Sequence, residues 1–504
     1  MAATAVGAGI LISRLAGLIR VRLFSKYLGL QEDAADAFNA AFRIPNLLQN
    51  LFGEGALSGS FIPIHSALRA RGEDHAAAQA ARTFFALLTV VITFIVLAGV
   101  LAAPWIVQVL SPGFTGAKRD LTVRLVRILF PGAGLLVASA WCLAVLNSHR
   151  RFLLSYTAPV AWNAAMIGCL LSFGGRTGLD TLAIYLAWAS VVGSFLQFAV
   201  QAPLAFSLSR HDRPMAFSEP VRQAVRNFIP VLISRGAVQL GASIDAIIAS
   251  LLPTGGVTAL SNAQLIYTLP VSLFGVSISA AELPAMSGDA AIAGHEALRA
   301  RLDAGLRRLA FFVVPSAAAF AALGDVIAGT LLQTGRFTAQ DATYVWAVLA
   351  GSSIGLLATT MARLYSVAHY AIGDTRRPLR IAIIRLVCST SLGYTLAVLV
   401  PPRLGINPLL GAAGLTISSG FAGWLEFALL RGSLNERIGR TGLKAGYTAR
   451  LWIAAIAAAA VGFAVKTIAP ADPLVRGALV VPVFGAVYLG VAFALRVPIP
   501  GLRR

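Results

Sequence analysis

The chain has 504 residues, of which 57 % are hydrophobic and 12 % are charged, whereas soluble domains carry about 25 % charged residues. This composition excludes one water-soluble core, and the mean hydropathy of +0.77 instead indicates a series of membrane-spanning helices. The net charge of +20 does not indicate nucleic acid as a partner. Membrane proteins gather Lys and Arg in their cytoplasmic loops, and this sequence has no soluble basic domain.

The apolar stretches are each close to the roughly 20 residues that cross a bilayer. They predict an all-α polytopic membrane protein with about fourteen transmembrane helices. In chain order the predicted helices are 4–28, 35–62, 80–110, 123–147, 153–173, 179–206, 222–252, 258–286, 304–332, 342–371, 378–400, 408–431, 448–469 and 475–496.

The loop charges predict the orientation of these helices. Loops after even-numbered helices are rich in arginine, as at Arg150 and Arg151 or at Arg376 and Arg377, and loops after odd-numbered helices are poorer. Positive loops stay on the cytoplasmic side of a membrane. The alternation therefore predicts that both termini are cytoplasmic.

Short stretches of sequence recur at an offset of about 221 residues, which indicates a duplicated unit. The matching pairs are Leu11-Ile12-Ser13-Arg14 with Leu232-Ile233-Ser234-Arg235, Leu51-Phe52-Gly53 with Leu273-Phe274-Gly275, and Pro63 with Pro284. Six helices in each copy give both copies the same orientation. We therefore expect an N-terminal lobe at 1–220, a C-terminal lobe in parallel repeat at 221–440, and two extra helices at 441–504.

The first, second and seventh helices carry polar side chains where a membrane helix is normally apolar. An ionised group at mid-bilayer costs at least about 2.5–3.5 kcal/mol on insertion scales, so it normally faces protein or a water-filled cavity. The duplication predicts that helices 1–2 and 7–8 face each other around such a cavity. The candidate cavity residues are Arg14, Arg20, Asp36, Arg43, Gln49, Glu54 and Arg235, and Asp245 lies in the same helix as Arg235.

The concentration of arginines predicts an anionic or phosphate-bearing substrate, because guanidinium groups bind phosphate oxygens bidentately. A structural interpretation of single residues stays open. Arg43 would then reach the membrane interface, and Asp36 would pair with Lys26 at the periplasmic edge. Catalysis has little support, since the sequence has no HExxH motif, no Walker loop and no paired-Cys metal spacing. We expect a transporter with no cofactor and no firm metal site, rather than an enzyme.

Several motifs together resemble those of the MurJ (MviN) family, the lipid II flippases of the multidrug/oligosaccharidyl-lipid/polysaccharide exporter superfamily. The strongest lies in helix 2 and comprises Asp36-Ala37-Phe38, the run from Ala41 to Leu48, Glu54-Gly55-Ala56-Leu57-Ser58 and Phe61-Ile62-Pro63. Others are Ser13-Arg14 with Gly17 and Arg20, Ser234-Arg235 with Gln239 and Asp245, Gly335-Arg336-Phe337, and Gly373-Asp374-Thr375-Arg376 with Pro378. The resemblance covers nearly the whole chain.

The resemblance implies a bacterial inner-membrane protein that moves lipid II, a lipid-linked peptidoglycan precursor, to the outer leaflet by alternating access. Its expected partners are this anionic lipid, membrane lipids and other cell-wall synthesis proteins. Arg14, Arg20, Asp36 and Glu54 carry over as functional cavity positions. Some family members have a cation site between helices 7 and 11, for which Asp245, Asp374 and Thr390 are the candidates. Transport would then be coupled to Na⁺ or H⁺, or to the membrane potential.

The chain departs from the family pattern at three positions. Val21 stands where an acidic residue is common, and Gln49 and Leu265 stand where helices 2 and 8 usually have arginines. Two alternative functions therefore stay open. One is a flippase for another lipid-linked oligosaccharide, and the other is a cation-coupled exporter of small molecules from the same superfamily. The second should favour an acidic cavity over an arginine-rich one.

Overall fold

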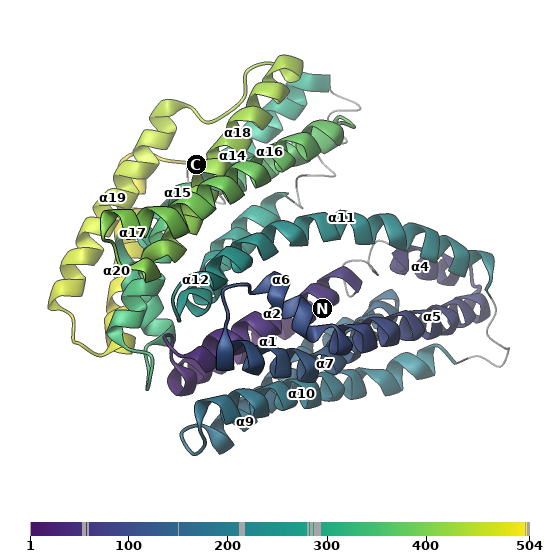
Figure 1. Ribbon diagram of the computed structural model, residues 1–504. Helices are drawn as coiled ribbons and strands as arrows, with labels where there is room; N and C mark the ends of the chain where they lie inside the picture. Colours follow the sequence, from purple (N-terminus) through teal and green to yellow (C-terminus); the bar gives the residue numbers. More distant parts are fainter. Residues whose placement is uncertain are drawn as a thin grey trace. The chain divides into compact units, whose positions relative to one another are not determined.

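A computed structural model describes residues 2–52, 57, 60–149, 151–210, 217–279, 282, 286, 294–498 and 500. Within these ranges it does not describe the side chains of residues 2–11, 45, 152, 230–231, 233–238 and 240–242. The chain divides into two compact units, shown in Figure 1. Unit 1 comprises residues 1–251 and 334–336, and unit 2 comprises residues 252–333 and 337–504.

Unit 1 is built from helices (Figure 1). They are α1 (Ala2–Leu28), α2 (Asp33–Phe52), α4 (Ile62–Ala70), α5 (Asp74–Leu101), α6 (Ala103–Leu110), α7 (Gly116–Ser148), α8 (Phe152–Thr157), α9 (Pro159–Phe173), α10 (Leu179–Leu208) and α11 (Glu219–Ser250).

Unit 2 continues in the same way. Its α-helices are α12 (Gly256–Pro270), α14 (Gly294–Leu332), α15 (Ala339–Ala371), α16 (Arg376–Tyr394), α17 (Val400–Leu404), α18 (Gly411–Ile438), α19 (Ala445–Ile468) and α20 (Pro473–Ala494). Two π-helical segments, η1 (Val271–Val276) and η2 (Thr395–Leu399), continue α12 and α16, and a short 3₁₀ helix, η3 (Pro408–Leu410), precedes α18.

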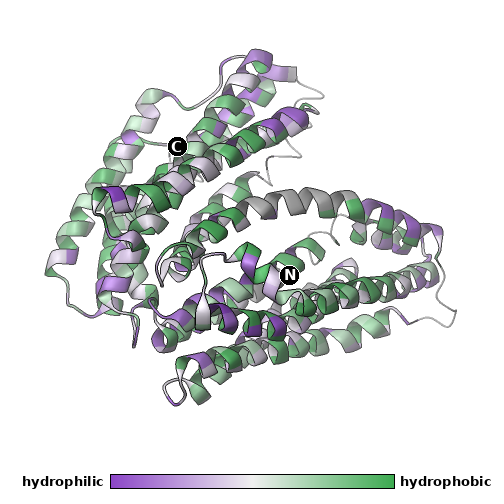
Figure 2. Cartoon of the chain, viewed as in Figure 1, coloured by the Kyte–Doolittle hydropathy of each residue, from purple (hydrophilic) through white to green (hydrophobic). Residues whose placement is uncertain are grey.

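The predicted all-α membrane fold is confirmed. Among the described residues, eleven helices are long and apolar enough to cross a membrane. Figure 2 shows one of them, α5, as hydrophobic along most of its length, with hydrophilic residues at the end that begins at Asp74. The remaining predicted crossings correspond to α1, α2 and α11, so the count of fourteen stays a prediction.

The bounds of several helices differ from the predicted ones for identifiable reasons. The predicted helix 80–110 is two helices, α5 and α6, which meet at Ala102. Pro104 at the start of α6 explains the break, because proline cannot donate the hydrogen bond that would continue α5. The predicted helix 304–332 begins ten residues earlier, at Gly294.

The two units use the same pattern of helix pairs. In unit 1, α7 packs against α2, α5 and α10, and α10 packs against α9. In unit 2, α15 packs against α12, α14 and α18, and α18 packs against α16. Each pair in unit 1 has a counterpart in unit 2. The counterpart is found by matching every membrane-crossing helix with the sixth crossing after it in the chain, as α7 with α15. The α11 helix packs against α2 and α5 and so belongs to unit 1. The lobe bounds drawn from the duplication stay a prediction.

Small residues and side-chain hydrogen bonds hold the helices together inside each unit. Hydrophobic burial gives little force between helices in lipid, so close packing and hydrogen bonds take its place. In unit 1 the buried Trp141 on α7 donates from Nε1 to the Ala81 carbonyl on α5, at 3.1 Å. A Cβ added at Gly99 would lie 2.0 Å from the Phe130 ring, so α5 and α7 approach where only glycine fits.

Candidate functional site

The guanidinium of Arg20 is held in place by two neighbouring residues of α9. Its Nε donates to Asn163 Oδ1 at 3.1 Å, and its Cζ lies 4.9 Å from the centre of the Trp162 ring. Asn163 is itself fixed, because its Nδ2 donates to the Pro159 carbonyl at 3.1 Å. No described residue accepts a hydrogen bond from the two terminal nitrogens of Arg20. They form the edge of the guanidinium that binds a carboxylate or phosphate bidentately.

The tryptophan under Arg20 is also tightly positioned. Trp162 Nε1 donates to the backbone oxygen and to the hydroxyl of Ser190 on α10, both at 3.2 Å. The Trp162 ring also stacks on Phe42 of α2, with centroids 5.6 Å apart. Arg20 therefore lies on a scaffold built from α1, α2, α9 and α10. Because Arg20 is already held in place, its side chain loses little conformational entropy when it binds an anion.

Asp36 on α2 lies in a buried ion pair. Its side chain is 1 % exposed, and its Oδ2 lies 2.9 Å from Lys118 Nζ near the start of α7. Lys118 also pairs with Asp33, at 3.1 Å, and lies over the Phe114 ring. The alternative partner proposed from the sequence, Lys26, is wrong, because that side chain is exposed and its Nζ lies 5.3 Å from the centre of the Tyr27 ring.

This ion pair should contribute to stability. We expect Lys118→Met to lower the free energy of unfolding by about 2 kcal/mol, because it leaves the Asp36 carboxylate buried without its cation. Fully buried pairs cost about 3–5 kcal/mol to break, and we expect less here because the second carboxylate, Asp33, is 59 % exposed. Thermal unfolding of the detergent-purified protein measures the loss. Lys26→Met is the matched control and should unfold like the unaltered chain, and an equal loss in both would contradict the assignment.

Arg43 on α2 lies within electrostatic range of two carboxylates, Asp245 on α11 and Asp36. The structure thus brings Arg43 together with Asp245, which the sequence analysis proposed as a cation ligand. Gln49 is half-buried on α2, and Arg14 is exposed on α1. Glu54 lies outside the described residues, as does the side chain of Arg235 on α11.

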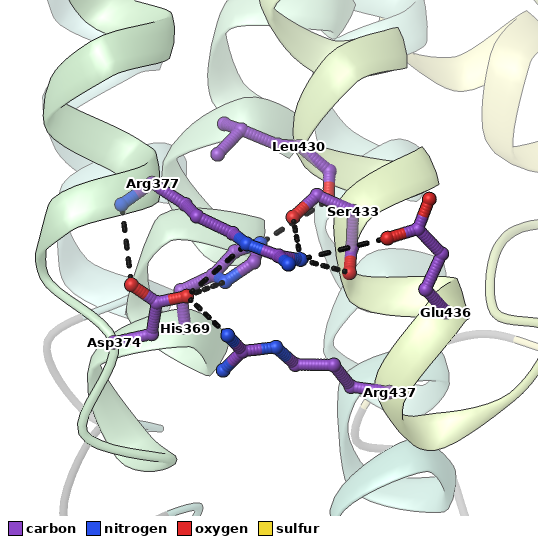
Figure 3. Close-up of polar contacts among 7 residues, drawn as sticks. All are labelled: His369, Asp374, Arg377, Leu430, Ser433, Glu436 and Arg437. Atoms are coloured by element: carbon purple, nitrogen blue, oxygen red, sulfur yellow. Dashed lines mark hydrogen bonds and ion pairs between the residues drawn. The ribbon is translucent and has the colours of Figure 1, made fainter.

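The other two candidate cation ligands lie in unit 2. Asp374 precedes α16, and Figure 3 shows its carboxylate facing Arg377, Arg437 and His369. Its Oδ2 lies 3.1 Å from Arg437 Nη2, and its Oδ1 accepts from the Arg377 backbone N–H at 3.1 Å. Burial acts to raise the pKa of Asp374, but that N–H and the nearby cations outweigh it and hold the pKa below its usual value.

The structure does not bring Asp374 and Thr390 together. Thr390 lies fourteen residues after the start of α16 at Arg376. At 1.5 Å per residue this places the two about 21 Å apart along the axis, too far to bind one cation. Asp374 and Thr390 therefore cannot share one cation, and each of Asp245, Asp374 and Thr390 stays a prediction only as a separate candidate ligand.

Sequence analysis missed a second group of charged residues inside predicted membrane helices. Arg363 lies on α15, Arg385 on α16 and Glu426 on α18. The signal was present, because each lies within an apolar stretch predicted to cross the membrane, and such residues are normally functional. Trp162 and Asn163 were also missed, because nothing in the sequence indicates that α9 packs against α1.

Comparisons with known proteins agree with the resemblance. Residues 24–475 match the family model described as lipid II flippase MurJ. The chain is 31 % identical over 438 residues to a Burkholderia cenocepacia protein named lipid II flippase MurJ, with 85 % of this chain and 82 % of that protein covered.

Two solved structures show the fold. A lipid II flippase MurJ in the inward closed conformation matches with a TM-score of 0.77 and 20 % identity, over 97 % of this chain and 98 % of that one. An inward-facing multidrug resistance transporter of the MATE family in the MOP superfamily matches with a TM-score of 0.67 and 16 % identity, over 86 % of this chain and 98 % of that one.

Proposed function

This chain belongs to the lipid II flippase MurJ family, and from that membership we propose that it moves lipid II across the bacterial inner membrane. The direction would be from the inner to the outer leaflet, for peptidoglycan synthesis. The observation that carries the proposal for this chain is the placement of Arg20, whose guanidinium is fixed by Trp162 and Asn163 with its terminal nitrogens directed to no described residue.

The chemistry of the substrate explains why such an arginine is needed. A pyrophosphate cannot enter hydrocarbon unaided, because a bare charge in a medium of low dielectric constant is very costly. Guanidinium groups replace the hydration of the phosphate oxygens, while the polyprenyl chain stays in the lipid. Arg14, Arg43 and Arg235 would supplement Arg20, and Gln49 and Glu54 would provide further polar groups in the same cavity. Asp36 would act indirectly, through its ion pair with Lys118.

We propose alternating access between two six-helix lobes, at 1–220 and 221–440, with the helices of 441–504 added to the second lobe. Both termini would be cytoplasmic. Rocking of one lobe against the other would expose the bound head group first to the cytoplasm and then to the periplasm. Other cell-wall synthesis proteins would use the lipid on the outer side.

The membrane potential could drive the export without ATP. An interior-negative potential favours outward movement of negative charge by about 2.3 kcal/mol per charge per 100 mV. Two uncompensated charges would therefore give up to about 4.6 kcal/mol, a ratio above about a thousand. Coupling to Na⁺ or H⁺ is the second route, and the MATE-family fold of similar structures is compatible with it.

The main alternative substrate is another lipid-linked oligosaccharide, which the departures at Val21, Gln49 and Leu265 keep open. A cation-coupled exporter of small molecules is less compatible with the arginines of α1 and α2, since cationic substrates favour acidic cavities.

The test is outer-leaflet exposure of lipid II in cells depleted of their own flippase and expressing this chain. We expect exposure to be restored, because the family and the arginine site match this substrate. Protein inserted at normal levels without restoring exposure would contradict the proposal and favour another lipid-linked anion.

A further inference from the structure

Three charged residues of unit 2 form a group inside helices that are long and apolar enough to cross a membrane. Arg385 Nη1 on α16 lies 3.3 Å from Glu426 Oε2 on α18. Arg363 on α15 is within electrostatic range of the same carboxylate and of the Tyr267 hydroxyl on α12. The group is therefore assembled from helices that pack against one another within one compact unit.

The depth of the group follows from the helical rise. Arg363, Arg385 and Glu426 lie 8, 9 and 12 residues from the predicted cytoplasmic ends of their helices. These separations correspond to about 12, 14 and 18 Å. The 33-residue α15 is about 50 Å long and so extends beyond a hydrocarbon core of about 30 Å. Its last turns then lie in the head-group region, which places the arginines just inside the inner leaflet.

The charges of the group do not balance. Two arginines share one carboxylate, and Glu426 is mostly buried, with 13 % of its side chain exposed. Arg385 is 40 % exposed, and Arg363 is exposed and has no hydrogen bond or ion pair to any described residue. A structural ion pair would need only one arginine. The second positive charge, which has no ion-pair partner among the described residues, is available to an anion, and we infer that the group binds one.

Hydrogen bonds connect α12 and α15 beside the arginines. Thr359 donates from its hydroxyl to the Gly355 carbonyl at 2.9 Å, and Tyr267 Oη lies 3.1 Å from the same hydroxyl oxygen. This bond joins α12 to α15 one helical turn before Arg363, which helps to hold the group in position.

The helices that carry the group also expose apolar side chains. They include Leu379, Ile383 and Val387 on α16 and Phe421 and Leu425 on α18. A small hydrophilic anion would gain nothing from these side chains. A lipid would gain binding free energy from both its phosphate and its chains. The phosphate would contact the guanidinium groups, and the chains would contact the apolar side chains.

We propose that Arg363 and Arg385 form a binding station for a lipid phosphate on the cytoplasmic side of unit 2, where the Glu426 carboxylate competes with the ligand for Arg385. The source of the phosphate is either the lipid-linked substrate on entry, which rests on the proposed function, or an anionic phospholipid of the inner leaflet. Either source presents the same phosphate to the same two arginines.

Binding to the full chain in nanodiscs of phosphatidylcholine tests the station without requiring transport. All variants carry Arg20→Ala so that the unit 1 site does not contribute, and the probes are a fluorescent polyprenyl pyrophosphate and phosphatidylglycerol. We expect Arg363→Gln with Arg385→Gln to weaken binding at least about tenfold. Arg450→Gln, which removes an exposed arginine of α19, is the matched control and should stay within about twofold.

Glu426→Gln gives a prediction of the opposite sign. It removes the carboxylate that competes with the ligand, so phosphate binding should strengthen by about threefold or more, whereas a purely structural role predicts weaker binding.

The double variant identifies the source of the phosphate. Loss of pyrophosphate binding alone assigns the station to the substrate, and an equal loss of phosphatidylglycerol binding assigns it to lipid phosphates in general. Unchanged binding in the double variant overturns the proposal. Failure of the unaltered chain to expose lipid II would overturn the proposed function but not this station.

Discussion

Arg20→Ala is expected to lower export of lipid II at least about a hundredfold at equal protein level. The guanidinium offers two terminal nitrogens to the pyrophosphate, and hydrogen bonds to charged groups contribute about 1.5–3 kcal/mol each. Loss of two such bonds therefore costs about 3 kcal/mol or more, which is a factor above a hundred. Because Trp162 and Asn163 hold Arg20 from α9, no other arginine on α1 can take its position.

Arg20→Lys separates charge from geometry in the same assay. Lysine keeps the positive charge but lacks the planar fork, and it cannot replace the hydrogen bond from Nε to Asn163. We therefore expect export between the levels of alanine and arginine. Arg176→Ala is the control, because Arg176 is exposed beyond the end of α9 and its Nη1 donates to the Ser172 carbonyl. Normal export by Arg20→Ala would remove Arg20 from the binding site.

The sequence was informative about the membrane fold because apolar length and loop charge are local properties. Each predicted crossing coincides with at least one described helix, and the errors lie at breaks such as Ala102, where one proline decides the outcome. The chemistry of Arg20 could also be predicted from its unusual position in an apolar helix. The predictions of the membrane helices and of the role of Arg20 both depend only on residues that are close together in the sequence.

The partners of these residues could not be predicted, because they depend on which helices pack together. Asp36 and Lys118 are 82 positions apart, and Arg20 and Asn163 are 143 positions apart. A single sequence carries no signal for such pairs, so Lys26 was the reasonable but wrong partner for Asp36. The station of Arg363 and Arg385 differs, because both arginines and Glu426 were visible in the sequence as charges in apolar stretches, and only their proximity was not.

The contact between α15 and α18 leads to the largest expected effect on stability. Gly351 and Gly355 form a GxxxG motif on α15, and on α18 Gly420 faces Gly355 while Thr416 faces Gly351. A Cβ added at Gly355 would lie 2.4 Å from the Gly420 Cα and 3.3 Å from its backbone N and C. Two backbones therefore touch, and neither can give way as a side chain could.

We expect Gly355→Ala to lower the free energy of unfolding by about 3 kcal/mol, at the upper end of the usual cost of overpacking, because α15 and α18 must separate along their length. Separation would also disturb Thr359, whose hydroxyl donates to the Gly355 carbonyl and lies 3.1 Å from Tyr267 Oη, beside the lipid phosphate station. The measurement is reversible unfolding in detergent micelles. Gly432→Ala on α18 is the matched control, since its added Cβ would meet nothing within 4 Å and should stabilise the helix by up to about 1 kcal/mol. Equal stability of the two variants would show that the glycine contact does not hold α15 against α18.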